Sequence, residues 1–417
     1  MLTVKQLPDL SGKKVYVRVD FNVPHKGEVI SDDNRIRAAI PTIKALLEKG
    51  ARVVLMSHLG KVDWKKLKKG EKTQEDIDGQ MKKNDLVIAV EPLKKHISEA
   101  MGHDVNVAFC PANRGPELAA AVAALNDGEI LLCQNTRYQP GEEKNDPELA
   151  AEWAGLVDAF VMDAFGSAHR AHASTVGVPE ALKAAGKPVF LGYLMINEVE
   201  NLTRCVEVKP EDRPYVAILG GLKVSDKIKV IDALIDKCDY IIIGGAMSYT
   251  FKKARGEEIG GSFLDEASLE YAKNCLAKAP GKIILPVDSV ITDSFEPVEG
   301  RQIKVAKAIP AEFQGVDIGP ETEKLFAEVI AKAKMVFWNG PMGVFEQPEF
   351  QSGTKAVCEA IKDLEGKAFT VCGGGDSAAA IKQFGYKANF SHVSTGGGAS
   401  LEMIENDGHL PGVDVLR

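Results

Sequence analysis

Val216-Ala217-Ile218-Leu219-Gly220-Gly221-Leu222-Lys223 is the stretch that decides the fold of this chain: an apolar run followed directly by two glycines and a lysine. A strand buried in a parallel sheet has such a continuous apolar sequence, and ligands bind outside the carboxyl ends of such strands. Glycines there let the backbone approach a ligand closely, and the helix that follows offers free N–H groups to an anion. The stretch therefore predicts a parallel α/β sheet with a ligand site at its carboxyl edge.

The same pattern recurs three times farther along the chain, at residues 240–245, 369–376 and 392–398. One cluster alone would be an ordinary strand-to-helix turn. Four clusters, two of which carry a charged residue (Lys223 and Asp376), favour a phosphate-bearing ligand held mostly by backbone. Walker A spacing is absent, and no GxGxxG fingerprint opens a helix. The competing enzyme class, an NAD-dependent dehydrogenase, is therefore disfavoured.

Length and composition limit the class of protein. A chain of 417 residues exceeds what one hydrophobic core usually supports, so two domains are expected. The net charge of −8 argues against a nucleic-acid or membrane-surface binder. Seven scattered cysteines without CxxC spacing indicate a reducing compartment and not a disulfide framework or a zinc site. We find no signal or membrane-spanning segment and expect a cytoplasmic protein.

Apolar strand-like runs alternate with alanine-rich helical patterns, as in a parallel sheet built from βαβ units. The predicted strands are residues 15–21, 52–57, 86–90, 105–109, 130–133 and 159–162 in the first half, and 215–219, 240–243, 282–285, 335–338, 369–372 and 392–394 in the second. The predicted helices are residues 35–48, 116–125, 147–156, 227–234, 267–277, 321–333, 354–364 and 377–384. Residues 192–206 are predicted to be a helix that links the two halves. The lysine-rich residues 61–83 are interpreted as a solvated surface excursion.

The strand ends of the first half carry basic and polar residues in place of glycines. Arg35 opens a helix, and the others follow separate strands: Asp20, Asn22, His58, Lys61, Arg137, Asp163, His169, Arg170 and His172. Arginine suits carboxylates and phosphates because its fork donates two parallel hydrogen bonds. Several cations gathered together repel one another unless an anion offsets them. We therefore expect this half to bind a small polyanion, and the whole chain to transfer a phosphoryl group between a nucleotide and a small acid.

The chain resembles the phosphoglycerate kinase family along nearly its whole length. The resemblance is carried by seven motifs: Val17-Arg18-Val19-Asp20-Phe21-Asn22-Val23-Pro24, Ser57-His58-Leu59-Gly60, Asp163-Ala164-Phe165-Gly166-Ser167-Ala168-His169-Arg170-Ala171-His172, Gly220-Gly221-Leu222-Lys223-Val224-Ser225-Asp226-Lys227-Ile228, Trp338-Asn339-Gly340-Pro341-Met342-Gly343-Val344-Phe345-Glu346, Gly373-Gly374-Gly375-Asp376 and Ser394-Thr395-Gly396-Gly397-Gly398-Ala399. It implies two Rossmann-like domains, each a parallel sheet flanked by helices, joined by a hinge helix. The expected boundaries are residues 1–188 for the phosphoglycerate domain, 189–208 for the hinge and 209–404 for the nucleotide domain. Residues 405–417 are expected to return to the first domain.

The resemblance also implies the reaction: reversible phosphoryl transfer from 1,3-bisphosphoglycerate to Mg-ADP, giving 3-phosphoglycerate and ATP, by a monomer that closes about its hinge. The residues it assigns to phosphoglycerate are Asp20, Asn22, Arg35, His58, Lys61, Arg137 and Arg170. Those it assigns to the nucleotide are Gly221, Lys223, Lys227, Gly245, Gly315, Asn339, Pro341, Val344, Glu346, Gly373, Gly374, Gly375, Asp376 and Ser377, with Asp376 also holding Mg²⁺. Arg35, Lys223, Gly375 and Gly398 are expected to act on the transferring group. No general base is required, because neither acceptor has a proton to lose.

Four positions depart from the usual pattern of the family. Lys61 and Val62 stand where Arg-Pro is usual, so the cation there lacks a bidentate fork. Leu222 replaces a small residue beside the expected nucleotide site, and Ser377 replaces threonine while keeping the hydroxyl. The alternative to an active kinase is a catalytically impaired homologue that still binds nucleotide.

Overall fold

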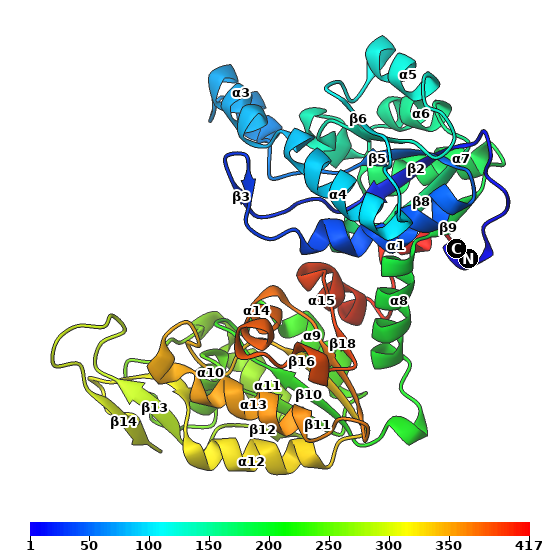
Figure 1. Cartoon of the computed structure of the whole chain (residues 1–417). Coiled ribbons are helices and arrows are strands. Elements are labelled where there is room, and N and C mark those ends of the chain that lie inside the picture. Colours follow the sequence, from blue (N-terminus) through cyan, green and yellow to red (C-terminus); the bar gives the residue numbers. More distant parts are fainter. The chain divides into compact units, whose positions relative to one another are not determined.

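The computed structural model describes all 417 residues of the chain. Two compact units are present (Figure 1). Unit 1 consists of Met1–Val199 together with His409–Arg417, and unit 2 consists of Glu200–Gly408. The helix α8 (Tyr193–Val206) contains the point where the chain passes from the first unit to the second.

Unit 1 is built on a seven-stranded parallel sheet with the order β1-β9-β8-β2-β5-β7-β6. Its centre is β2, in which Val15 pairs with Val53 on one side and Ala159 on the other. The buried apolar runs of the sequence supply the central strands, as expected for a sheet covered on both faces. The strands are β1 (Leu2–Thr3), β2 (Lys14–Val19), β5 (Arg52–Met56), β6 (Val107–Cys110), β7 (Ile130–Cys133), β8 (Ala159–Asp163) and β9 (Val189–Leu191).

Most helices of unit 1 bury apolar residues on one face, whereas the two helices within residues 61–83 bury only Ile77 between them. In α1, Ile36, Ala39, Ile40, Ile43 and Leu47 recur at intervals of three or four residues and are buried. The helices are α1 (Asn34–Glu48), α2 (Trp64–Lys68), α3 (Gln74–Lys83), α4 (Val90–Met101), α5 (Gly115–Ala123), α6 (Pro147–Gly155) and α7 (Val178–Ala184). A short antiparallel pair, β3 (His25–Lys26) with β4 (Val29–Ile30), lies outside the main sheet.

The strand predicted at residues 86–90 is wrong. Leu86–Ala89 form a turn of 3₁₀ helix that leads directly into α4. The side chain of Asp85 accepts a hydrogen bond from the N–H of Val87 and so caps this helical turn. Residues 86, 89, 93 and 97 are all buried, which is helical spacing, so the short apolar run belongs to an amphipathic helix. The surface excursion at residues 61–83 is largely exposed, as predicted, but it folds into α2 and α3.

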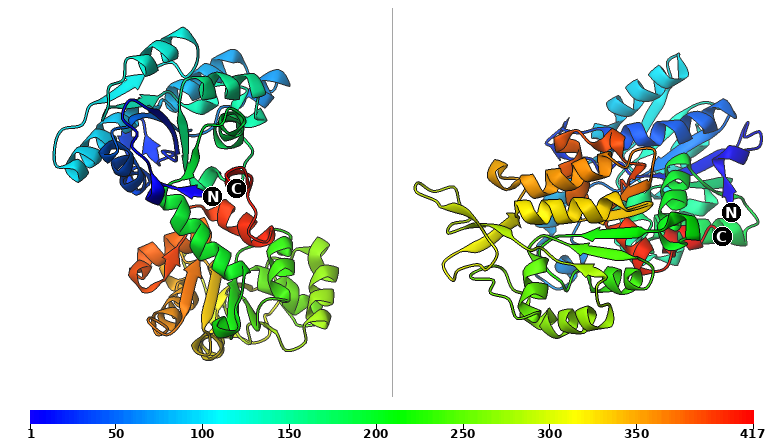
Figure 2. Two further views of the ribbon diagram at one scale, coloured as in Figure 1. Left: turned by 90° about the vertical axis from the view of Figure 1, so that its right-hand side faces the viewer. Right: turned by 90° about the horizontal axis from the view of Figure 1, so that it is seen from below.

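Unit 2 is built on a six-stranded parallel sheet with the order β12-β11-β10-β16-β17-β18. Its strands match the predicted positions: β10 (Tyr215–Leu219), β11 (Tyr240–Ile243), β12 (Ile283–Ile284), β16 (Met335–Asn339), β17 (Phe369–Cys372) and β18 (His392–Val393). Its helices are α9 (Ile228–Ile235), α10 (Met247–Ala254), α11 (Leu269–Lys278), α12 (Pro320–Ala331), α13 (Ser352–Lys362), α14 (Gly375–Phe384) and α15 (Gly397–Glu405). Helices lie on both sides of this sheet (Figure 2), and α12, α13 and α14 share one buried core with it. The predicted fold class, parallel α/β sheets flanked by helices, is confirmed.

A second sheet of unit 2 was not predicted. It consists of three antiparallel strands in the order β14-β13-β15, namely β13 (Ser289–Thr292), β14 (Ile303–Ala306) and β15 (Gln314–Ile318). β13 and β15 pair with a shift of register between Val290 and Ile291. This sheet carries part of the site described below. No helix in the structure has both the length and the apolar character needed to cross a membrane.

The last residues of the chain are part of unit 1. Leu410 and Val413 are fully buried there, on either side of the start of the short helix α16 (Pro411–Asp414). The N–H of Gly412 donates to the carbonyl oxygen of Ala168 at 2.8 Å, and a Cβ at Gly412 would lie only 3.0 Å from the Ala168 Cα. Glycine at this position therefore lets the C-terminal segment pack closely against Ala168.

Candidate functional site

The carboxyl edge of the parallel sheet in unit 2 is formed by two glycine turns that touch. Gly220 follows β10 and Gly340 follows β16, and the N–H of Gly220 donates to the carbonyl of Asn339 at 2.9 Å. A Cβ on Gly220 would lie 2.1 Å from the Pro341 carbonyl oxygen, and one on Gly340 would lie 2.2 Å from the Gly220 oxygen. No side chain fits at either position, so the glycines bring the two backbones together where a ligand would bind.

A cavity of about 510 Å³ opens beside these turns. Its lining is mostly glycine and apolar side chains, with two carboxylates, those of Glu346 and Asp376. This volume lies within the range of sites that hold a drug-sized or nucleotide-sized molecule. The lining residues are Gly221, Leu222, Gly245, Ala246, Tyr249, Phe295, Gly315, Val316, Pro341, Met342, Gly343, Val344, Glu346, Gln347 and Asp376.

A second cavity of about 220 Å³ shares Gly221, Pro341 and Asp376 with the first, so the two adjoin. It is lined by Gly220, Gly221, Lys227, Asn339, Gly340, Pro341, Gly374, Gly375, Asp376, Ser377, Gly397, Gly398 and Leu401. Helix α14 begins at Gly375 and helix α15 begins at Gly397, so two helix N-termini contribute their unpaired N–H groups to its wall. Helix N-termini attract anions. The smaller cavity is therefore suited to phosphate, and the larger to an apolar group joined to it.

Lys227 supplies the cation of the smaller cavity. Its ammonium donates to the side-chain oxygen of Asn339, whose amide in turn donates to the carbonyl of Gly373 at 2.7 Å. Burial lowers the pKa of Lys227, while Asp226, Asp376 and Glu405 oppose that shift. A half-buried ammonium whose pKa is lowered by burial is stabilised by a bound anion.

Most of the residues predicted for the nucleotide line one of these cavities. Lys223 and Gly373 do not: Lys223 is exposed directly after Leu222, and Gly373 is buried behind Asn339. The prediction omitted Tyr249, Phe295, Val316, Gln347 and Leu401. Phe295 and Val316 belong to the antiparallel sheet or its connections, which carried no glycine signal in the sequence.

Asp376 is the one residue predicted to hold a metal. Its carboxylate is exposed and lines both cavities. The structure has no group of three or more His, Cys, Asp or Glu side chains that could enclose an ion. A single carboxylate next to a phosphate cavity nevertheless fits Mg²⁺, which usually keeps several waters and binds through one or two carboxylates plus the phosphates of its ligand.

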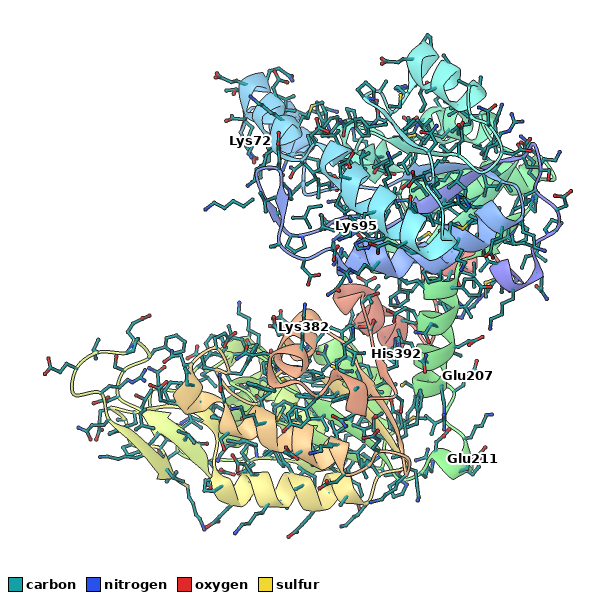
Figure 3. The ribbon with its side chains drawn as sticks, in the orientation of Figure 1. Lys72, Lys95, Glu207, Glu211, Lys382 and His392 are labelled. Carbon is teal, nitrogen blue, oxygen red and sulfur yellow. The ribbon has the colours of Figure 1, made fainter.

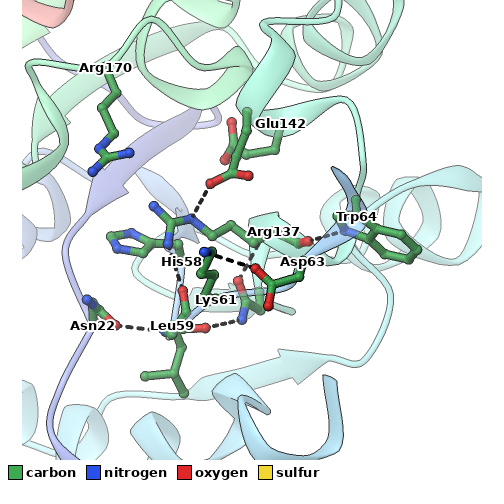
Figure 4. A network of polar contacts seen from close by, with 12 residues as sticks. Asn22, His58, Leu59, Lys61, Asp63, Trp64, Arg137, Glu142 and Arg170 are labelled. Atoms are coloured by element: carbon green, nitrogen blue, oxygen red, sulfur yellow. Dashed lines mark hydrogen bonds and ion pairs between the residues drawn. The ribbon is translucent and has the colours of Figure 1, made fainter. Parts of the chain in front are cut away.

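In unit 1 the predicted anion-binding residues follow β2, β5, β7 and β8, except Arg35, which lies at the start of α1. The guanidinium of Arg35, at the start of α1, donates to both carboxylate oxygens of Asp20 at 2.9 Å. The Asn22 side chain accepts a hydrogen bond from the N–H of Gly60 at 2.8 Å, and Arg137 donates to the Gly60 carbonyl at 2.7 Å. Asn22, His58, Lys61, Arg137 and Arg170 come together around this loop (Figure 4). Arg170 is exposed, so its charge is accessible to a ligand.

A buried polar layer below these residues was missed by the sequence prediction. Arg18 is only 1% exposed, although it lies in β2. Its guanidinium donates to the Ser174 hydroxyl at 2.8 Å and contacts His58 Nδ1 at 3.1 Å. Glu142 is fully buried and accepts hydrogen bonds from the hydroxyl and the N–H of the same serine. Because a guanidinium can only donate, His58 Nδ1 accepts and its proton is on Nε2.

Burial, with nearby arginines, keeps the two imidazoles of this site uncharged. Burial lowers the pKa of His58 well below its usual value, and Arg18, Arg137 and Arg35 lower it further. Burial lowers the pKa of His172 to about 4; Glu142 opposes this shift, and Arg18, Arg137 and Arg170 add to it. Arg137 is buried enough that its own pKa falls, and its Nε forms no hydrogen bond. The arginines of this site thus lie beside uncharged imidazoles, an arrangement suited to binding an anion.

Asp163 does not belong to this site, although the sequence places it at the end of a strand with Arg170. The carboxylate is buried and accepts a hydrogen bond from the N–H of Leu194 at 3.1 Å, while Thr42 accepts one from the N–H of Tyr193 at 2.9 Å. Asp163 and Thr42 thereby cap the beginning of α8. The second carboxylate oxygen of Asp163 has no hydrogen-bond partner, and burial raises its pKa to about 7.

Comparison with known proteins finds one family along nearly the whole chain. The family model described as phosphoglycerate kinase matches residues 4–407. The chain is 47% identical to the phosphoglycerate kinase of Latilactobacillus sakei, across 99% of this chain and 98% of that protein. It is 48% identical to the Enterococcus faecalis protein of the same name, with the same coverage. Among solved structures, phosphoglycerate kinase from Coxiella burnetii matches with a TM-score of 0.83 and 36% identity, covering 100% of this chain and 98% of that one.

Proposed function

The chain belongs to the phosphoglycerate kinase family, and from that premise we propose that it transfers a phosphoryl group reversibly between 1,3-bisphosphoglycerate and Mg-ADP, giving 3-phosphoglycerate and ATP. The observation that carries this proposal is the presence in one chain of two complementary anion sites. One is lined by glycines, helix N-termini and Lys227, and the other by arginines around uncharged imidazoles. The first suits the phosphates of a nucleotide, and the second suits a small acid with several charges.

In unit 2 the larger cavity is assigned to the nucleoside and the smaller to its phosphates. The apolar lining of the larger cavity, which includes Phe295 and Tyr249, favours a flat aromatic base. Glu346 supplies an acceptor suited to ribose hydroxyls. Lys227 and the N-termini of α14 and α15 neutralise the phosphates, and Lys223 follows on the exposed side of Gly221.

Asp376 would hold Mg²⁺ together with the nucleotide. The bound ion would neutralise charge on the phosphate oxygens. The exposure of Asp376 leaves room for the waters that such an ion retains.

In unit 1 phosphoglycerate is assigned to the loop between Asn22, His58 and Arg137. His58 can only donate through Nε2, because Arg18 occupies Nδ1. Arg35, Arg137 and Arg170 supply the positive charge, and Asp20 holds the Arg35 guanidinium in place. Neither acceptor of the phosphoryl group carries a proton that must be removed, so positioning and charge neutralisation are sufficient. We propose that the two units close about α8 so that the bound ligands meet.

The test is ADP formation from ATP and 3-phosphoglycerate, measured with and without Mg²⁺. Turnover that requires both substrates and the metal supports the proposal. The Lys223→Ala variant is expected to lose at least about 100-fold in kcat, as is typical when a group that stabilises transferring charge is removed. Nucleotide binding without turnover would instead indicate the impaired homologue.

A further inference from the structure

One carboxylate, that of Asp63, lies between two lysines at the edge of the anion-binding loop of unit 1. Lys61 Nζ lies 2.9 Å from one carboxylate oxygen, and Lys72 Nζ lies 2.8 Å from the other. The side-chain amide of Gln80 donates to the same oxygen as Lys72, at 2.9 Å. These partners, Lys72 first, hold the pKa of Asp63 well below its usual range. Figure 4 shows the pair formed by Lys61 and Asp63 beside Arg137.

The two lysines differ in how far they are shielded from water. The side chain of Asp63 is 10% exposed and that of Lys72 is 28% exposed, whereas that of Lys61 is 68% exposed. Water and salt weaken an exposed ion pair much more than a shielded one. Lys61 is therefore the partner that can leave Asp63 at small cost.

The backbone around both lysines is fixed. The Lys61 carbonyl accepts a hydrogen bond from the Asn84 side chain at 3.1 Å, and the neighbouring Gly60 is held by Asn22 and Arg137. Lys72 lies in the turn before α3 (Figure 3), where its N–H donates to the carbonyl of Lys66 and Thr73 caps the helix. A movement of Lys61 toward a ligand is thus a movement of its side chain alone.

We propose that Lys72 is a positioning residue that makes Lys61 available to the anionic substrate of unit 1. When Lys61 turns to the substrate, Lys72 stays on Asp63 and keeps that mostly buried carboxylate paired. Without Lys72, the release of Lys61 would leave Asp63 with the neutral amide of Gln80 as its only side-chain partner, and an uncompensated buried charge is unfavourable. Asp63 would then retain Lys61. This inference rests on the proposed function, because it takes phosphoglycerate as the anion.

The experiment compares Lys72→Met, Lys61→Met and the double variant, with Lys68→Met as the matched control. Lys68 is exposed on α2 and carries the same charge in the same lysine-rich segment. Lys72→Met is expected to raise the KM for 3-phosphoglycerate by about fivefold, as for the loss of one ion pair, with kcat and the KM for ATP nearly unchanged. The double variant should be no worse than Lys61→Met alone, because both changes remove one and the same contact. Lys72→Arg should behave as the unaltered protein.

A further double variant tests whether the charge of Asp63 is what retains Lys61 when Lys72 is absent. Adding Asp63→Asn to Lys72→Met removes the charge that retains Lys61 and should bring the KM back to within about twofold of the original value, since coupled changes cancel. Additive effects of the two lysines, an equal effect of Lys68→Met, or no recovery with Asp63→Asn would each overturn the inference. The dissociation constant of 3-phosphoglycerate, measured by calorimetry, should change from variant to variant in the same order as the KM. This measurement does not require turnover. Absence of turnover therefore contradicts the proposed function, while the ratios of these constants still decide the role of Lys72.

Discussion

Replacing Asp163 by asparagine should raise the free energy of unfolding of unit 1 by an amount that increases with pH. The carboxyl group has a folded-state pKa of about 7, raised by burial from its ordinary value of 3.8. The folded protein therefore keeps this proton in a range where the unfolded chain has already lost it. A group with a raised acidic pKa destabilises the folded state progressively as pH rises from its unfolded to its folded pKa.

The magnitude follows from the width of that range. Each pH unit within it costs about 1.4 kcal/mol of folding free energy. Between pH 5 and pH 8 only the interval up to pH 7 contributes, so the carboxyl group destabilises unit 1 by about 2–3 kcal/mol more at pH 8 than at pH 5. Asparagine does not titrate. It can still accept the hydrogen bond from Leu194, and the second carboxylate oxygen, which has no partner, would be replaced by an unpaired amide with a pH-independent cost.

Urea unfolding of the full chain measures this difference. Trp64 and Trp153 lie in unit 1 and Trp338 lies in unit 2, and these are the three tryptophans of the chain. With Trp338→Phe in both proteins, fluorescence reports on unit 1 alone. The control is Asp317→Asn, since burial also raises the pKa of Asp317 in unit 2 to about 7. That variant should leave the unit 1 transition unchanged.

The reasoning would be refuted if the gain in the free energy of unfolding of unit 1 caused by Asp163→Asn were the same at pH 5 and pH 8. A larger gain at pH 5 than at pH 8 would also refute it. Either would mean that Asp163 is not protonated in the folded protein near neutral pH. Asp163 would then cap the start of α8 as an ionised carboxylate.

Three further predictions concern both units. Lys227→Met should raise the KM for ATP at least about tenfold and leave that for 3-phosphoglycerate unchanged, because it removes the cation of the phosphate cavity; equal effects on both KM values would contradict this. Gly374→Ala should lower kcat/KM for ATP and cost about 1–3 kcal/mol of stability in a thermal melt, because Gly374 has φ +104° and a Cβ would lie 2.3 Å from the Asn339 amide nitrogen; a normal melt would show that the turn relaxes. All seven cysteines are buried, and burial raises the pKa of thiols such as Cys358, to about 12. A disulfide reagent should therefore react slowly with the native protein and rapidly in urea, and fast native labelling would show that the core opens.

The sequence predicted the parallel sheets well because their strands are buried on both faces. Runs such as that of β10 have no other plausible structure once glycines follow them. The glycine clusters after β10, β11, β17 and β18 then indicated the edge of the sheet at which the two cavities lie, and the family resemblance supplied the lining residues that follow β16. Phe295 and Val316 could not be found in this way, because they belong to the antiparallel sheet and its connections, where no glycine cluster follows the short strands.

The buried polar layer of unit 1 was missed for a different reason. Arg18 lies inside a strand, where a charged residue is normally read as facing solvent. Its partner Ser174 is 156 residues away in the sequence. Glu142 lies in a polar stretch that gives no sign of burial. Only the fold brings these residues together, so no local pattern could have identified them. The ion pair of Asp63 with Lys72 likewise depends on the turn between α2 and α3, which brings Lys72 back to Asp63.

The packing of Leu410 and Val413 into unit 1 has a consequence for how the protein is made. Unit 2 is a continuous stretch of chain, but unit 1 needs residues from both ends. At about 5–20 residues per second, a ribosome takes roughly 10–40 s to synthesise the residues of unit 2 that separate those two parts. During that time unit 1 lacks its last helix, α16, and the surface around Ala168 that Gly412 later contacts is exposed to solvent. The unit that is synthesised first is therefore the one that is finished last, and a chain truncated by nine residues would affect the half of the protein farthest from the cut in sequence.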